Sequence, residues 1–140
     1  MILFDIERNS YVDGPGIRTT VFFKGCNLKC VWCHNPESQS FKKEIMFYKN
    51  KCIGCGKCLE KCKFGGIKDA NKCTACGKCA MYCPKDARKV CGKEYSADEV
   101  LKEILKDKPF YKSSGGGVTF SGGECMLQPA DLLDLLKKCK

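Results

Sequence analysis

The sequence has no long apolar run and no excess of acidic residues, and it contains a single histidine. No stretch approaches the 18 uncharged apolar residues of a membrane-spanning helix. The apolar residues 1–4 are followed too closely by Asp5 and Glu7 to form the apolar core of a secretion signal. We therefore expect a globular, cytoplasmic chain with no membrane partner, in keeping with 44% apolar and 29% charged residues. The only histidine, His34, is interpreted as a supporting or capping residue rather than an acid or base.

Cysteine, by contrast, makes up 14 of the 140 residues. In a secreted mini-protein this content would indicate a disulfide scaffold. Here there is no export signal, and eleven of the cysteines stand in runs with two or three residues between neighbours. That spacing is typical of metal ligands. The cysteines are therefore interpreted as ligands rather than disulfide partners.

The net charge of +9, from 25 basic and 16 acidic residues, would by itself indicate an anionic partner such as nucleic acid. Eleven ligating thiolates around three doubly positive iron–sulfur cores would contribute about −5, because ligating thiols are deprotonated. Aromatic residues also do not alternate with basic ones as in a single-strand binder. We expect no nucleic-acid partner, and a cysteine-rich zinc module that binds nucleic acid is the disfavoured interpretation.

The first 25 residues are predicted to be extended. Ile2, Phe4 and Ile6 stand at every second position, residues 13–16 form a turn, and residues 19–23 are β-branched or aromatic, as in a buried strand. Cys26 follows directly. It therefore lies on the loop at the carboxyl end of a strand, where α/β folds build their sites.

Two helices are predicted after residue 95. The first begins at Ser96, whose capping box is completed by Glu99, and Pro109 is expected to end its pattern. A short strand at 118–120 leads to a second helix that begins at Pro129. The expected apolar faces are Val100, Leu101, Ile104 and Leu105, and then Leu132, Leu133, Leu135 and Leu136. The second face has no evident packing partner, so the chain is expected to be truncated.

Cys26, Cys30 and Cys33 offer three thiolates within eight residues. A [4Fe–4S] cluster normally takes four. Three ligands would leave one iron open to a small molecule, as a catalytic zinc site keeps an open position. The alternative is a zinc or structural iron site with a distant fourth ligand.

Eight further cysteines form two runs of the bacterial ferredoxin spacing, 21 residues apart. In that pattern the fourth cysteine of each run ligates the other cluster. The predicted sets are Cys52, Cys55, Cys58 and Cys83, and Cys73, Cys76, Cys79 and Cys62. Zinc is the alternative ligand. The segment has too little apolar sequence to fold by burial alone, so bound metal is expected to stabilise it.

Three segments together resemble the glycyl-radical-enzyme activases of the radical S-adenosylmethionine superfamily. They are residues 13–18 (DGPGIR), residues 22–38 (FFKGCNLKCVWCHNPES) and residues 95–124, which end in GGGVTFSGGE. The resemblance implies an α/β fold, the N-terminal part of a partial (β/α) radical-SAM barrel with an inserted α+β ferredoxin-like two-cluster domain. The corresponding domains are residues 1–48, 49–90 and 91–140.

The resemblance also implies an activity. S-adenosylmethionine chelates the open iron and is reductively cleaved to methionine and a 5′-deoxyadenosyl radical, which abstracts hydrogen from a glycine of a partner enzyme under anaerobic conditions. Trp32 is implied to lie by the adenine, and Gly122, Gly123 and Glu124 to hold the methionine amino group. Asp13, Gly14 and Arg18 are implied to contact the partner's glycine loop. Each assignment has a plainer alternative. Trp32 would be a core tryptophan, Gly122 and Gly123 an ordinary turn, and residues 13–18 a β-turn.

The implied cofactors are three [4Fe–4S] clusters and S-adenosylmethionine. The implied partners are a glycyl radical enzyme as protein substrate and flavodoxin or ferredoxin as electron donor. The protein is expected to be a monomer. The 140-residue piece alone is expected to be inactive. The two ferredoxin-type clusters are expected either to relay electrons or to act as a scaffold. The alternative function is a ferredoxin-type electron-transfer protein without radical chemistry. Cys91 and Cys139 are predicted to be small buried residues, and Cys125, where the family commonly has proline, is given no catalytic role.

Overall fold

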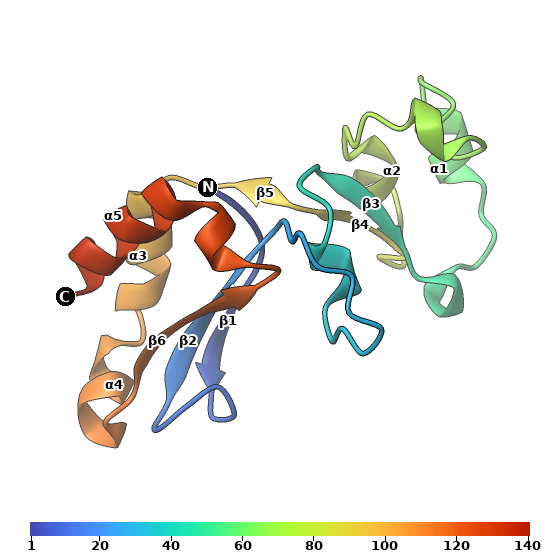
Figure 1. Cartoon of the computed structure of the whole chain (residues 1–140). Helices are drawn as coiled ribbons and strands as arrows, with labels where there is room; N and C mark the ends of the chain where they lie inside the picture. Colours follow the sequence, from blue (N-terminus) through green and yellow to red (C-terminus); the bar gives the residue numbers. More distant parts are fainter. The chain divides into compact units, whose positions relative to one another are not determined.

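The computed structural model describes all 140 residues, which divide into two compact units. Met1–Lys42 and Gly92–Lys140 form the main unit, and Lys43–Cys91 form a second unit, called the insert below (Figure 1). The sequence suggested an insert at 49–90. It begins earlier in the structure because β3 (Glu44–Phe47) pairs antiparallel with β4 (Arg88–Cys91), which joins the two ends of the segment. None of the helices combines the length and the apolarity that crossing a membrane requires.

A four-stranded sheet in the order β5-β1-β2-β6 forms the framework of the main unit. Its strands are β1 (Ile2–Ser10), β2 (Arg18–Phe23), β5 (Lys93–Glu94) and β6 (Gly117–Gly122). β1 runs antiparallel to both neighbours, whereas β2 and β6 are parallel and in unbroken register. A parallel pair needs a long crossover connection, and here that connection contains the whole insert and two helices. Short 3-10 turns are η1 (Pro36–Ser38) and η4 (Cys125–Leu127).

The helices of the main unit are α3 (Ala97–Leu105), α4 (Lys108–Ser114) and α5 (Pro129–Cys139). The predicted capping box is confirmed, because Ser96 accepts from the Glu99 N–H and the Glu99 carboxylate accepts from the Ser96 N–H. The start of α5 at Pro129 is confirmed too. α4 was missed. Pro109 stands in its first turn, where a missing N–H costs nothing, so the residue that was expected to end one helix begins another.

The core lies between the sheet and the helices α3 and α5, which run side by side over one face (Figure 1). It comprises Leu3, Val21, Phe23, Val100, Ile104, Leu132 and Leu135. The expectation that α5 has nothing to pack against was therefore wrong for Leu132 and Leu135. It fits Leu133 and Leu136, which are exposed, as is Leu105 of α3.

The insert repeats one local structure. A 3-10 turn, a cysteine loop and a short helix occur as η2 (Lys49–Lys51) with α1 (Lys57–Lys61), and again as η3 (Ala70–Lys72) with α2 (Lys78–Met81). Only three of its side chains are buried, those of Cys79, Ala87 and Cys91, and all are small. Such a segment gains little from apolar burial, as the sequence predicted, so its stability has to come from elsewhere.

Candidate metal centres and cofactor site

The loop that carries Cys26, Cys30 and Cys33 leaves the carboxyl end of β2 and is closed at its base. The Gly25 N–H donates to the Ser38 carbonyl at 2.6 Å, and the Cys26 N–H donates to the Gln39 carbonyl at 3.0 Å. All three thiols of the loop lie at or near the surface. These two hydrogen bonds join the start of the loop, at Gly25 and Cys26, to its end, at Ser38 and Gln39. The three cysteines therefore lie on one closed loop.

Two side chains that sequence reasoning missed hold this base in place. Lys24 is fully buried, and its ammonium donates to the Glu37 carbonyl at 2.6 Å. The Gln128 amide donates to the carbonyls of Lys24 and Ile2, each at 2.9 Å, and accepts from the Ile2 N–H at 2.8 Å. A buried lysine is stable only when its ammonium is hydrogen-bonded. No local pattern could have revealed these contacts, because they join residues up to 126 positions apart.

Gly122 and Gly123 place the end of β6 directly against the base of this loop. The Gly123 N–H donates to the Phe23 carbonyl and the Glu124 N–H to the Gly25 carbonyl, both at 2.8 Å. A β-carbon on Gly123 would lie 2.3 Å from the Gly25 oxygen, and one on Gly122 would lie 2.2 Å from the Phe23 oxygen. Only glycine permits this approach. Two motifs almost a hundred residues apart therefore share one edge of the sheet.

The Glu124 side chain and the Cys125 thiol have local roles in this structure. The Glu124 carboxylate accepts from the Met126 N–H at 2.9 Å and so caps η4. Burial, and then the nearby Glu124 carboxylate, raises the pKa of the Cys125 thiol, which packs against the core. That thiol is therefore neutral at pH 7. Cys91 is buried as predicted, whereas Cys139 is exposed, so that prediction was wrong.

Trp32 lies on the surface of the cysteine loop rather than in the core. Its side chain is 82% exposed, and its neighbour Val31 is 96% exposed. Leu28, on the same loop, is also exposed. The loop thus presents apolar side chains beside its thiols, and the core-tryptophan alternative does not describe this structure.

The segment of Asp13, Gly14 and Arg18 lies at the amino end of β2, the opposite end of the strand from Cys26. The Asp13 carboxylate accepts from the Ser10 and Thr20 hydroxyls at 2.6 and 2.7 Å. These bonds hold the pKa of Asp13 below its usual value.

Arg18 is equally engaged. It donates to the Thr119 hydroxyl and to the Val118 carbonyl, each at 2.6 Å. The side chains of Asp13 and Arg18 therefore stabilise the turn between β1 and β2. The structure does not bring them to the cysteine loop.

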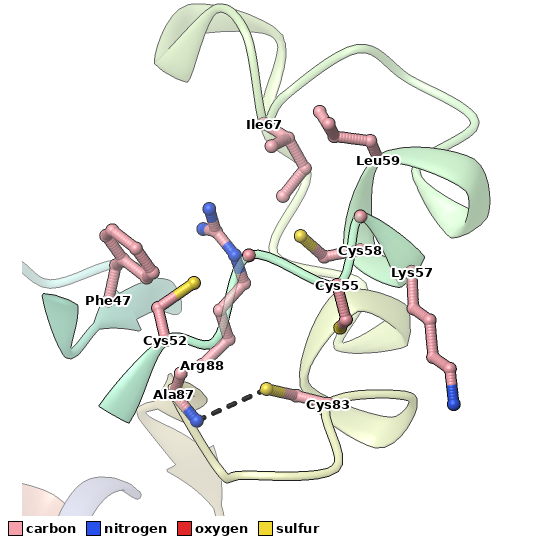
Figure 2. A pocket seen from close by; sticks show the side chains of 12 residues that line it. Phe47, Cys52, Cys55, Lys57, Cys58, Leu59, Ile67, Cys83, Ala87 and Arg88 are labelled. Carbon is pink, nitrogen blue, oxygen red and sulfur yellow. Dashed lines mark hydrogen bonds between the residues drawn. The ribbon is translucent and has the colours of Figure 1, made fainter. Parts of the chain in front are cut away.

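In the insert, the last cysteine of each run shares a cavity with the other run. One cavity, of about 190 Å³, is lined by Cys52, Cys55, Cys58 and Cys83 (Figure 2). The other, of about 20 Å³, is lined by Cys62, Cys73, Cys76 and Cys79. Both sets of four are those that the ferredoxin spacing predicts. Nowhere do three His, Cys, Asp or Glu side chains converge closely enough to hold a single metal ion. Thiols that surround a cavity suit a cluster of several irons, since a lone zinc needs its sulfurs within about 2.3 Å of one point.

Cys62 and Cys83, each the last cysteine of one run and a lining residue of the other run's cavity, are surrounded by main-chain N–H groups. The Ala87 N–H donates to the Cys83 sulfur at 3.2 Å (Figure 2). Hydrogen bonds from Lys85, and then from Ala87 and Arg88, lower the pKa of Cys83. The pKa of Cys62 is lowered in the same way, most by the Ile67 N–H. Such donors stabilise a thiolate and tune the potential of a cluster bound to it.

The backbone of the insert also repeats every 21 residues. Left-handed conformations occur at the paired positions Gly54 and Ala75, Gly56 and Gly77, and Gly65 and Asp86. Ala75 (φ 49°) thus adopts a conformation that glycine takes in the first run, at a cost of about 1–2 kcal/mol for a residue with a β-carbon. A strained conformation kept at the same point of both runs indicates that the cysteine loops need this geometry.

Arg88 lines the larger cavity. It faces Phe47 across the β3–β4 pair, and its guanidinium carbon lies 4.4 Å from the centre of that ring. Figure 2 shows the side chain rising between Cys52 and Cys58. The stacking fixes a permanent positive charge beside four thiols.

Two family models and several curated relatives match this chain. Residues 12–68 match the family model of a 4Fe-4S single cluster domain, and residues 66–89 match that of a 4Fe-4S binding domain. The chain is 47% identical to the trans-4-hydroxy-L-proline dehydratase activating enzyme of Clostridioides difficile, over 99% of this chain and 49% of the relative. It is 41% identical to the choline trimethylamine-lyase activating enzyme of Oleidesulfovibrio alaskensis, over 99% of this chain and 48% of the relative.

A third relative is the benzylsuccinate synthase activating enzyme of Thauera aromatica, 43% identical over 91% of this chain and 43% of the relative. The chain spans about half the length of the curated relatives it matches. The similarity includes both the cysteine loop of the main unit and the two runs of the insert, because it covers nearly all of the 140 residues. Over nearly its whole length the chain is therefore similar to the N-terminal half or so of glycyl-radical-enzyme activating enzymes.

Proposed function

We propose that the full-length protein activates a glycyl radical enzyme. It would cleave S-adenosylmethionine reductively to methionine and a 5′-deoxyadenosyl radical, which removes hydrogen from a glycine of the partner enzyme. One observation carries the proposal: the Glu124 N–H bonds to the Gly25 carbonyl. This bond brings the segment that would bind the methionine end of the cofactor to the base of the Cys26 loop.

The residues present fit the cofactors. Cys26, Cys30 and Cys33 would hold one [4Fe–4S] cluster by three irons and leave the fourth for the amino and carboxylate groups of S-adenosylmethionine. When bound, that cluster supplies the electron for cleavage of the carbon–sulfur bond. The chain's own part is to position and shield. Gly122 and Gly123 allow the main chain to come close, and a carboxylate such as Glu124 suits an ammonium group.

Trp32 is proposed to cover the adenine. Its exposed ring is free to stack on a flat ligand, and its place between Cys30 and Cys33 keeps it near the open iron. Ligand burial by this apolar loop would exclude water from the reacting atoms.

The architecture is proposed to be the beginning of a partial (β/α) barrel with an inserted two-cluster domain. The parallel strands β2 and β6, with α3 and α5 over one face, supply the repeating element of such a barrel. The insert would hold the second and third [4Fe–4S] clusters in its two cysteine-lined cavities. A ferredoxin-type electron carrier would have no use for the tight contact between Gly123 and Gly25.

Anaerobic incubation of the reconstituted full-length protein with dithionite and S-adenosylmethionine tests the proposal. We expect 5′-deoxyadenosine and about twelve irons per chain, whereas a plain two-cluster ferredoxin would hold about eight irons and form no 5′-deoxyadenosine. Substitution Cys30→Ala should abolish the product while the clusters of the insert remain. Product that persists in this variant would contradict the proposal.

A further inference from the structure

The positive charge of the chain is concentrated in the insert. Residues 43–91 hold 12 of the 25 basic residues but only 4 of the 16 acidic ones, a formal net charge of +8, and the main unit carries the remaining +1. Eight thiolates around two doubly positive cores would still leave the insert at about +4. A field confined to one unit attracts an oppositely charged partner to that unit.

The lysines that produce this field reach the surface. All eleven lysines of the insert are exposed. Lys51 lies over the Tyr48 ring and Lys61 over the Tyr82 ring, each at about 5 Å, which holds these ammonium groups at the surface. Acidic neighbours are too few to neutralise the lysines, so the field extends into solvent.

The cysteine-lined cavities open onto the same charged unit. Cys52 and Cys55 of the larger cavity are exposed, as are Cys73 and Cys76 of the smaller one. Ile53, between the first two, is 61% exposed. A small apolar contact within a charged surrounding is typical of transient electron-transfer complexes, which are steered by charge and bury little area.

We propose that the insert is the docking surface for an acidic one-electron carrier protein, of the reduced flavodoxin or ferredoxin class, at the cavity of Cys52, Cys55, Cys58 and Cys83. This inference rests on the proposed function, which needs an external electron. Two basic side chains, Lys57 and Arg88, line this cavity, whereas Lys78 is the only basic residue that lines the second one. This difference in positive charge selects the first cavity. The carrier loses one electron and the cluster held there gains one. No bond forms or breaks, and no proton is transferred.

The ionic strength dependence of reduction is the first test. The reconstituted full-length protein is mixed anaerobically with an acidic flavodoxin in its hydroquinone state, and cluster bleaching is followed by stopped flow. We expect the second-order rate constant to fall at least about tenfold between low and physiological salt. Reduced methyl viologen, a cation, should show no such fall. A flavodoxin rate that does not depend on salt would overturn the proposal.

Charge reversal is the second test. The combined substitutions Lys49→Glu, Lys51→Glu and Lys61→Glu, at exposed lysines that line neither cavity, should slow reduction by flavodoxin about tenfold or more, with the methyl viologen rate and the iron content unchanged. The control combines Lys102→Glu, Lys112→Glu and Lys137→Glu, which make the same change of charge on exposed sites of the main unit. Equal slowing in both variants would contradict a docking site on the insert. The salt test decides the question if the insert variant loses iron.

A nucleic-acid partner would be attracted by the same positive charge, so it is tested separately. A 30-nucleotide single strand is titrated against the wild-type protein at physiological salt. We expect it to bind more weakly than flavodoxin and to leave the rate of reduction unchanged. Binding that blocks reduction by flavodoxin and is tighter than flavodoxin binding would identify nucleic acid as the partner and overturn the proposal.

Dithionite bypasses the carrier protein, so it separates the docking surface from the radical chemistry. We expect 5′-deoxyadenosine to form when dithionite replaces flavodoxin. Its absence would sink the proposed function. Its presence, together with a flavodoxin reaction that does not depend on salt, would sink only the docking surface.

Discussion

The main-chain N–H of Glu124 donates a 2.8 Å hydrogen bond to the carbonyl oxygen of Gly25. This bond extends the pairing of β2 and β6 past the end of both strands, up to the residue before the first cysteine. It depends on Gly123, since any side chain there would collide with the Gly25 carbonyl. The geometry of the cofactor site therefore rests on main-chain contacts as much as on the cysteines.

Substitution Gly123→Ala should disrupt this contact. The new β-carbon would lie 2.3 Å from the Gly25 oxygen and 3.0 Å from the Ser38 oxygen, so the strand end and the loop must separate. We expect a loss of about 1–3 kcal/mol in the free energy of urea unfolding and much weaker binding of S-adenosylmethionine. The matched control is Gly117→Ala in β6, because its β-carbon would meet only the Arg18 guanidinium, at an ordinary contact distance of 3.8 Å. Unimpaired cofactor binding by the Gly123 variant would argue against the contact.

Substitution of Cys83, the last cysteine of the second run, should remove one cluster of the insert. Cys83 lines the cavity of the first run, so Cys83→Ala is expected to lower the iron content of the full-length protein by about four per chain. Cys91→Ala serves as control, because Cys91 is buried in the same unit but lines neither cavity. Iron analysis and low-temperature electron paramagnetic resonance make the measurement. Loss of the same iron from both variants would show only that the insert unfolds.

Arg88 should raise the reduction potential of the cluster beside it. Its charge favours the reduced, more negative state of a neighbouring cluster. Arg88→Gln is expected to shift one of the two insert potentials to a more negative value, while Arg88→Lys shifts it less. Potentiometric titration followed by electron paramagnetic resonance resolves the two clusters. Unchanged potentials in the glutamine variant would exclude this effect.

Asp107 should make the main unit sensitive to acid. It is fully buried and accepts from the Arg8 guanidinium at 3.0 Å and from the Thr19 hydroxyl at 2.7 Å. The bond to Arg8 holds its pKa below the usual value. A carboxyl whose pKa is lower in the folded chain stabilises the fold at pH values above its pKa in the unfolded chain, which is about 3.9. This stabilisation is lost as the pH falls through the pKa of the folded chain.

The variant Asp107→Asn tests this contribution. At pH 7 it should unfold with about 2 kcal/mol less free energy than the wild type, since hydrogen bonds to a charged group are lost. The difference should shrink as the pH falls below about 4. Urea unfolding at matched iron content, followed by far-ultraviolet circular dichroism, makes the comparison. A difference that stays constant down to pH 3 would mean that the charge of Asp107 contributes nothing.

Local patterns predicted much of the fold. The β-branched run of β2 and the capping box of Ser96 and Glu99 each act within a few residues, so the sequence displays them directly. β1 is a strand as predicted, but its buried apolar residue is Leu3, which the pattern of every second residue did not include. α4 was missed because a proline is compatible with both the end of one helix and the start of the next. The packing of Leu132 and Leu135 against α3 could not be predicted, because it depends on how distant elements meet.

The candidate site divides in the same way. Cysteine spacing alone grouped the thiols that line each cavity of the insert, since ligand spacing is a local property. The anchoring by Lys24 and Gln128 and the position of Arg18 at the far end of β2 depend on tertiary contacts. The sequence carries no local sign of them.

The most direct test of the radical mechanism concerns the iron that Cys26, Cys30 and Cys33 leave open. The electron paramagnetic resonance spectrum of the reduced full-length protein is recorded with and without S-adenosylmethionine, in wild type and in a variant in which all eight insert cysteines from Cys52 to Cys83 are replaced by alanine. We expect the cofactor to change the signal of the one remaining cluster in the variant. A signal that is present but unchanged by the cofactor would mean that a fourth side chain occupies that iron, and the radical mechanism would be wrong.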